Sequence, residues 1–94
     1  MVNHDKRLIY SKSISWVEIN DEVFVFDELN GSIHLFRRVE REIWKLIDTE
    51  VTFTIIVNSI QKNFNVNEEK TLTIIKKFQE ENLVEESKEN ISIR

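Results

Sequence analysis

The sequence predicts a single α+β domain of winged-helix-like architecture, in which a three-stranded antiparallel sheet is followed by three helices. Two observations support this. Apolar residues alternate or run in short stretches as far as Phe36, whereas from Val39 onward they recur at helical spacing. With 94 residues, 40% of them hydrophobic, the chain can build one modest core. We therefore expect one domain over residues 1–94, with a core from about residue 14 to about residue 84 and polar tails.

The three strands are predicted in the first half of the chain. Residues from Ile14 to Ile19 alternate between two faces, and Asn20-Asp21 is a turn signal. The segment Glu22–Glu28 contains a continuous run of β-branched and aromatic residues, which is typical of a central strand. Asn30-Gly31 predicts a type I′ hairpin, because that turn needs positive φ at both central residues. The third strand is then Ser32–Phe36.

The three helices are predicted in the second half. Apolar residues share one side of a first helix from about Arg38 to Asp48. Thr52 is a suitable N-cap for a second helix, whose apolar stripe ends at Phe64. Asn67, followed by acidic residues that favour a helix N-terminus, opens the third helix. Asn82 can adopt the left-handed conformation that commonly ends a helix.

Composition argues against catalysis, cofactors and membranes. Without cysteine there is no disulfide, no thiolate metal site and no cysteine nucleophile, and the two histidines, His4 and His34, lie far apart in the sequence. No glycine-rich loop is present to hold phosphate. The N-terminal residues lack a signal-peptide core, and no run approaches the ~20 apolar residues of a membrane span. We expect a cytoplasmic protein that is not an enzyme and holds no cofactor or metal.

The charge distribution disfavours nucleic-acid binding but does not exclude it. A net charge of −4 opposes binding to phosphate. The basic cluster of the predicted first helix contains Arg37, Arg38, Arg41 and Lys45. The predicted third helix, which would enter a groove of DNA, carries Glu68, Glu69, Glu80 and Glu81. A winged-helix nucleic-acid-binding protein is therefore the weaker alternative.

The third strand, Ser32–Phe36, is predicted to lie at a sheet edge. It has no charged residue before Arg37 to protect its unpaired backbone, so an extended peptide could join it as an additional strand. The alternative is that the chain covers this edge itself. The tail from Glu85 onward is polar and is expected to fray, but Ile91 and Ile93 alternate as in a short strand.

The third helix offers a second binding feature beside that edge. Its apolar arc is wider than one small core requires, with Leu72, Ile75 and Leu83 at the centre. Ile74 and Phe78 lie on the flank of the arc. Lys70, Lys77 and Glu81 border this flank, as expected for an apolar strip in a peptide groove. The alternative is that Ile74 and Phe78 complete the core.

Together these segments resemble the PqqD family of precursor-peptide recognition elements, which serve pathways for ribosomally made, modified peptides. The resemblance is carried by Leu29–Phe36, Ile43–Asp48, Phe53–Val57 and Phe78–Val84, and it spans roughly residues 14–84. Asn82 stands where the family has glycine, and Arg37 and Thr49-Glu50 also depart from the family pattern. The resemblance implies three strands, three helices, no cofactor and no catalysis.

The resemblance also implies a function and a site. The leader segment of a precursor peptide would lie as an added strand between the third strand and the third helix, and would be delivered to a separate modifying enzyme or leader peptidase. Carried over by position, the peptide-binding residues are Ile33, His34, Leu35, Phe36, Arg37, Lys70, Thr71, Ile74, Lys77 and Phe78. A third alternative is a homodimer or structural adaptor that pairs two sheets through Phe24, Phe26 and Trp16.

Overall fold

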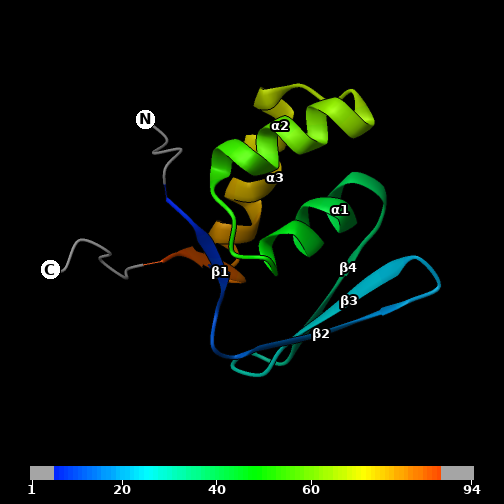
Figure 1. Ribbon diagram of the computed structural model, residues 1–94. Helices are drawn as coiled ribbons and strands as arrows, with labels where there is room; N and C mark the ends of the chain where they lie inside the picture. Colours follow the sequence, from blue (N-terminus) through cyan, green and yellow to red (C-terminus); the bar gives the residue numbers. More distant parts are fainter. Residues whose placement is uncertain (1–5, 88–94) are drawn as a thin grey trace, which may run out of the picture.

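The computed structural model describes residues 6–87 and places three helices above a three-stranded antiparallel sheet (Figure 1). The sheet consists of β2 (Ile14–Ile19), β3 (Glu22–Asp27) and β4 (Ser32–Phe36), with β3 in the centre. The helices are α1 (Arg38–Ile47), α2 (Phe53–Phe64) and α3 (Glu68–Glu80). The predicted fold class, with its meander followed by three helices, is confirmed. None of the described helices is long and apolar enough to cross a membrane.

The helix boundaries follow local capping. The Thr52 hydroxyl accepts a hydrogen bond from the Ile55 N–H at 3.4 Å, and the Asn67 side chain accepts one from the Lys70 N–H at 2.9 Å. Both caps satisfy a backbone donor that the first turn of a helix leaves free. The residue at the N-cap of α1 is Arg37, whose side chain makes no capping hydrogen bond. The chain turns sharply there, and Arg38 has a φ of 54°.

The two hairpin turns differ from the prediction. Asn20 and Asp21, between β2 and β3, both have positive φ, as a two-residue type I′ turn requires. Between β3 and β4 only Gly31 has positive φ, and four residues, 28–31, separate the paired Asp27 and Ser32. The type I′ turn expected at Asn30-Gly31 is therefore wrong. The Asp27 side chain accepts the Leu29 N–H at 3.0 Å, which stabilises the longer loop.

A second, two-stranded sheet was not predicted. β1 (Leu8–Tyr10) pairs antiparallel with β5 (Val84–Glu86), so the chain segments that flank the main fold lie side by side at its left in Figure 1. Leu8 is fully buried, which extends the core beyond the expected span. The expectation of a frayed chain from Glu85 is wrong for Glu85 and Glu86, because β1 supplies their backbone partners.

The core is centred on Trp44 of α1. Its indole stacks on Tyr10 at 4.5 Å between ring centroids and meets Phe36 and Phe78 at 5.4 Å each. The Tyr10 hydroxyl donates a hydrogen bond to the Trp44 carbonyl oxygen at 2.5 Å. Aromatic contacts of this kind add to the stabilisation from apolar burial. The core therefore joins β1 to β4, α1 and α3, and the last three elements surround the candidate site.

The outer face of the main sheet, away from the helices, is largely apolar. Residues paired across antiparallel strands share a face, and the pairs Val17–Phe24, Phe24–Leu35 and Phe26–Ile33 lie on this outer face. Trp16 does not belong to it, because its ring makes an edge contact with Trp44 in the core. The prediction that grouped Trp16 with Phe24 and Phe26 on one outer face is therefore wrong for Trp16.

Candidate peptide-binding site

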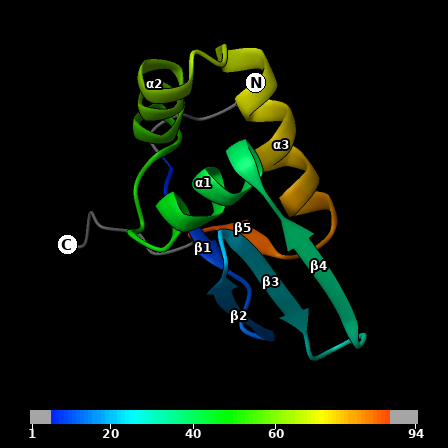
Figure 2. The same cartoon turned by 90° about the vertical axis from the view of Figure 1, so that its right-hand side faces the viewer.

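One edge of the main sheet is open. Within residues 6–87, β4 pairs only with β3, and its other edge faces the viewer's right in Figure 2. The predicted edge position of the strand is confirmed for the described chain. The alternative covering segment, Ile91–Ile93, lies outside the described residues. The free edge offers a row of backbone groups to which an extended chain could pair.

The register identifies the residues whose backbone groups point outward. The Glu28 N–H donates to the Ser13 carbonyl oxygen at 3.0 Å, and hydrogen-bonded and non-bonded pairs alternate from there along β2 and β3. The backbone of Phe24 therefore bonds toward β2, which leaves its other partner, Leu35, in a non-bonded pair. The N–H and C=O groups of Leu35, and by the same alternation of Ile33, point to the free edge.

The side chains of β4 divide between two faces. Ile33 and Leu35 lie on the outer face and are exposed by 68% and 41%. His34 points toward the helices, with Nε2 3.1 Å from the Ser32 hydroxyl and Nδ1 3.5 Å from the Glu81 carboxylate. This contact joins β4 to the C-terminal end of α3. Phe36 is buried against Trp44 and Phe78.

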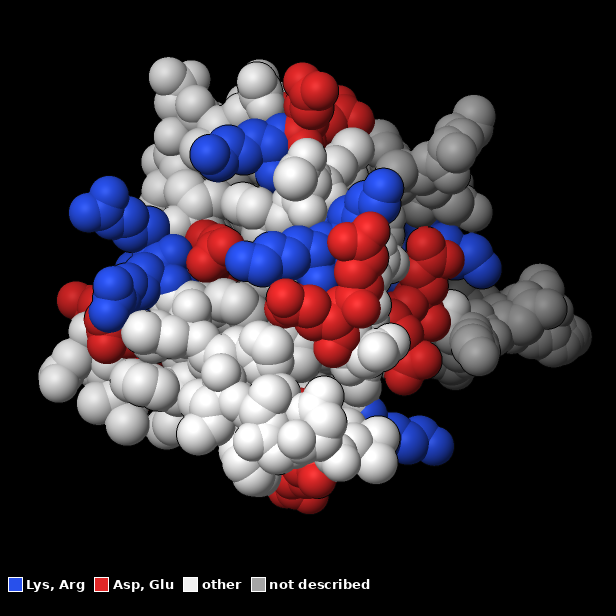
Figure 3. Space-filling view, turned by 180° about the vertical axis from the view of Figure 1, so that it is seen from behind, with Lys and Arg blue, Asp and Glu red and all other residues white. Residues whose placement is uncertain are grey.

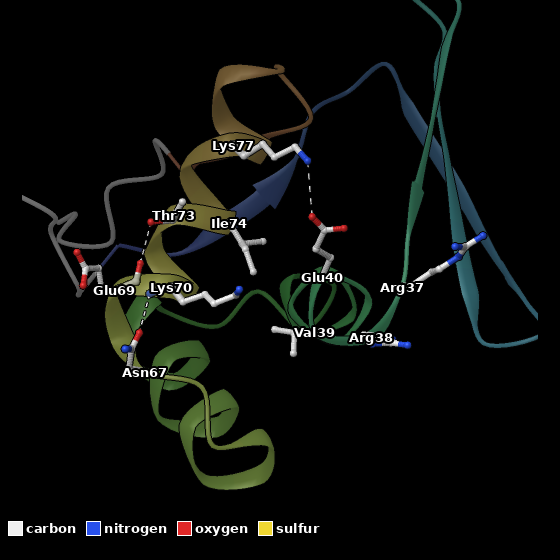
Figure 4. Close-up of a pocket in the computed structure, with 10 residues that line it drawn as sticks. All are labelled: Arg37, Arg38, Val39, Glu40, Asn67, Glu69, Lys70, Thr73, Ile74 and Lys77. Atoms are coloured by element: carbon white, nitrogen blue, oxygen red, sulfur yellow. Dashed lines mark hydrogen bonds and ion pairs between the residues drawn. The ribbon is translucent and has the colours of Figure 1, made fainter.

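A hollow of about 730 Å³ lies where β4 gives way to α1, between the first turn of α1 and α3 (Figure 4). We call it the α1–α3 hollow. Val39 and Ile74 are its apolar residues. The other lining residues are Arg37, Arg38, Glu40, Asn67, Glu69, Lys70, Thr73 and Lys77. An apolar centre bordered by polar and charged groups suits a side chain of a bound peptide.

The basic residues that line this hollow differ in whether they form an ion pair. Lys77 Nζ lies 3.6 Å from the Glu40 carboxylate, across the hollow from α3 to α1. Arg37 Nε lies 2.5 Å from the Glu22 carboxylate on β3, and Figure 4 shows its side chain directed away from the hollow. Lys70 extends from α3 toward α1 and has no ion pair with a described residue. Lys70 is therefore available to an acidic group entering from solvent.

The ten predicted site residues fall into three groups. Arg37, Lys70, Ile74 and Lys77 line the α1–α3 hollow. Ile33, His34 and Leu35 lie along β4, where peptide pairing would take place. Phe36, Thr71 and Phe78 are buried in the core. Their side chains offer almost no surface to a peptide in this structure, and they pack beneath the site.

The position of Phe78 shows why the predicted helix face was misplaced. The prediction centred the apolar arc partly on Leu83, but α3 ends at Glu80 and Leu83 belongs to the turn before β5. Without Leu83 the buried face of α3 carries Thr71, Ile74, Ile75 and Phe78. Ile74 is only 9% exposed and both Ile74 and Phe78 belong to the core, so the alternative that these two residues complete the core is confirmed. Of the predicted apolar flank, only Ile74 borders the hollow.

Sequence reasoning missed the contribution of the first turn of α1. Val39 and Glu40 line the hollow, and Arg38 reaches it because its positive φ folds the chain back directly after β4. A signal was present, since a helix that begins two residues after an edge strand must place its first turn beside the end of that strand. Asn67, Glu69 and Thr73 were also missed, although they share the exposed side of α3 with Lys70.

The basic cluster considered for nucleic acid is largely neutralised. Arg41 pairs with Glu42 at 2.7 Å and approaches Glu18 and Asp21 at 3.7 and 3.4 Å, while Lys45 lies 2.9 Å from Glu18. The Glu42 hydrogen bond is the main cause that raises the pKa of Arg41. Cations held by carboxylates are poorly placed to neutralise phosphates.

The site contains groups for binding and few for chemistry. Within residues 6–87, no three His, Asp or Glu side chains lie close enough together to hold a metal ion. Burial is the main cause that raises the pKa of Tyr10 above its ordinary value, and its hydroxyl serves a core hydrogen bond. The open backbone edge and the α1–α3 hollow remain as features that can recognise a ligand.

Comparison with known proteins gives structural matches only. No protein-family model and no curated protein sequence matches this chain. Two solved structures match with a TM-score of 0.74 each: TbiB1 in complex with the TbiA(beta) leader peptide and a lasso peptide synthetase B1 complexed with the leader peptide. The chain has the fold of lasso peptide synthetase B1. The expected PqqD-like fold is thereby confirmed.

Both structural alignments extend over most of the chain. The alignment to TbiB1 has 20% sequence identity and covers 82% of this chain and 94% of TbiB1. The alignment to the lasso peptide synthetase B1 has 10% identity and covers 83% of this chain and 96% of that protein. At these identities the match establishes a shared fold. It does not identify the residues of this chain that bind a ligand.

Proposed function

We propose that this chain binds the leader segment of a ribosomally made precursor peptide as an added strand along the free edge of β4. The observation that carries the proposal is the outward direction of the Ile33 and Leu35 backbone groups, with the α1–α3 hollow at the end of the same strand. Two proteins of the same fold are described in complex with leader peptides, which supports it.

Recognition would combine two kinds of contact. Backbone hydrogen bonds to β4 would contribute about 0.5–1.5 kcal/mol each and would be largely independent of sequence. Selectivity would come from side chains of the added strand, which alternate between the two faces of the sheet. On one face they would meet the flank of α3 and the hollow, where Ile74 and Val39 offer apolar contact.

The proposed role is delivery without catalysis. A module that holds the leader raises the local concentration of the attached core peptide for a modifying enzyme or leader peptidase. Such a partner needs a surface separate from the peptide edge. The apolar outer face of the sheet, with Val17, Phe24 and Phe26, is the surface we propose for that enzyme or for a second copy of the chain.

The decisive experiment is an amide NMR titration with the leader of a precursor peptide encoded beside this gene. The largest shifts are expected at Ile33 and Leu35. Leu35→Pro removes one outward N–H without breaking a bond to β3, so it should weaken binding about tenfold. Leu35→Ala is the matched control, because it removes the same side chain and keeps the outward N–H. Equal affinity of the wild type and Leu35→Pro, with both folded, would refute strand addition.

A further inference from the structure

The strand site runs between two ends of opposite charge. Lys70, Ile74, Lys77 and Glu81 recur at helical spacing along one flank of α3. The α1–α3 hollow joins the first turns of α3 to Arg37, at the end of β4. The His34–Glu81 contact joins the last residues of α3 to the middle of β4. The helix therefore runs antiparallel to β4, and its charges are arranged along the free edge.

The end beside the hollow is cationic. Four lining residues are basic and two, Glu40 and Glu69, are acidic, although the whole chain carries −4. Lys77 and Arg37 have carboxylate partners, whereas Lys70 and Arg38 have no ion pair with a described residue. Of these two, Lys70 extends across the hollow, whereas Figure 4 shows Arg38 directed away from α3, so Lys70 is the cation that attracts an acidic side chain entering the hollow.

The opposite end is anionic. Glu81 is exposed by 39% at its side chain and contacts only the imidazole of His34 among the described ion-pairing groups. Glu80 is exposed beside it, and Glu28 is exposed in the loop before β4. On the face seen in Figure 3, red and blue side chains are mixed across the middle, and most of the area below them is white.

We propose that the site selects the order of charges in a bound segment: acidic residues beside Lys70, and basic residues beside Glu81. This inference rests on the proposed function. A strand antiparallel to β4, the commoner pairing, begins at the hollow. Its acidic residues therefore precede its basic residues in sequence. Lys70 and Glu81 are 11 residues apart, a rise of about 16 Å along α3, so about five strand residues separate the two charges.

The test uses two synthetic peptides of identical composition. Each has the same central segment of alternating valine and threonine; one carries glutamates before it and lysines after it, and the other has these charges exchanged. At low salt the acid-first peptide is expected to bind about tenfold more tightly, with the difference shrinking as salt rises. Lys70→Glu should reduce the preference, whereas Lys76→Glu, exposed elsewhere on α3, should preserve it.

The outcomes separate this inference from the proposed function. Equal affinities, or tighter binding of the basic-first peptide, with amide shifts at Ile33 and Leu35 would overturn the charge order and leave strand addition standing. If neither peptide shifts those amides although the leader does, the charge order fails and strand addition stands; if the leader shifts none of them either, both fail. An equal loss of preference in Lys70→Glu and Lys76→Glu would also overturn the inference, because it would reflect overall charge.

Discussion

Thr71 was predicted to contact the peptide, but the structure buries it on α3. Its side chain is fully buried on α3, and its hydroxyl has no hydrogen-bond partner within the described structure. A buried hydroxyl without a partner costs about 1–3 kcal/mol of desolvation. The resemblance to the PqqD family had assigned Thr71 to the peptide surface by position alone.

Thr71→Val therefore separates the two roles. Valine keeps the shape of the side chain and removes the unpaired hydroxyl, so the free energy of unfolding should rise by about 1 kcal/mol. Peptide affinity should be unchanged, since the residue has no exposed surface. Urea unfolding and the NMR titration measure the two quantities. A weaker peptide complex with unchanged stability would restore Thr71 to the binding surface.

Tyr10 gives the structure a dependence on high pH. Its raised pKa means that folding favours the neutral phenol, so this contribution to stability is complete below about pH 10 and is lost as pH rises further. Tyr10→Phe removes both the hydrogen bond to Trp44 and the ionisable group.

We expect Tyr10→Phe to be about 1 kcal/mol less stable than the wild type at neutral pH. Above about pH 10 the two proteins should converge, because only the wild type loses stability through phenol ionisation. Urea unfolding at a series of pH values measures this. A constant difference across the whole range would show that ionisation of Tyr10 is not coupled to folding.

At the scale of elements, features that depend on neighbouring residues could be predicted from the sequence, and features that depend on distant residues could not. The caps at Thr52 and Asn67 are short-range signals, and the left-handed φ of Asn82, 62°, matches its place after α3. The β1–β5 ribbon was missed because its pairing joins Leu8 to Glu86, and no local pattern encodes so distant a partner. The hollow was only partly predicted because its walls depend on how α1 and α3 pack together.

The missed ribbon should be important for stability. Leu8 has no exposed surface, and Leu8→Ala should lower the free energy of unfolding by about 2–4 kcal/mol through lost burial and a cavity. Ile9→Ala is the matched control, since Ile9 is adjacent in β1 but partly exposed, and should cost less than half as much. Urea unfolding measures both, and equal costs would mean that the Leu8 contacts do not stabilise the fold.

At the scale of the whole molecule, the helices cover one face of the sheet and leave the other exposed. Val17, Phe26 and Ile33 on the outer face are each exposed by 41% or more. Apolar areas of several hundred Å² on small soluble proteins usually mark contact surfaces. The residues paired at the centre of this outer face, such as Val17 with Phe24 and Phe26 with Ile33, carry no charge. Two copies of the chain can therefore meet there without placing like charges together.

We therefore expect the isolated chain to self-associate at high concentration through this face. Sedimentation should give a mass that rises above the monomer's 11.3 kDa with concentration. Val17→Lys should abolish the rise, because it buries an unpaired charge in the contact. Ile55→Lys, at an equally exposed position on α2, should leave it intact. A constant monomer mass at all concentrations would assign the face to a different protein.

The β1–β5 ribbon has a consequence for combining this module with other proteins. Because Leu8 and Glu86 are direct partners, the two ends of the fold emerge together, and Figure 1 shows them on the side away from the β2–β3 turn. A loop of a larger enzyme could be cut and joined to both ends without being stretched. The module could thus be transplanted as an insert, with its peptide edge left facing the solvent.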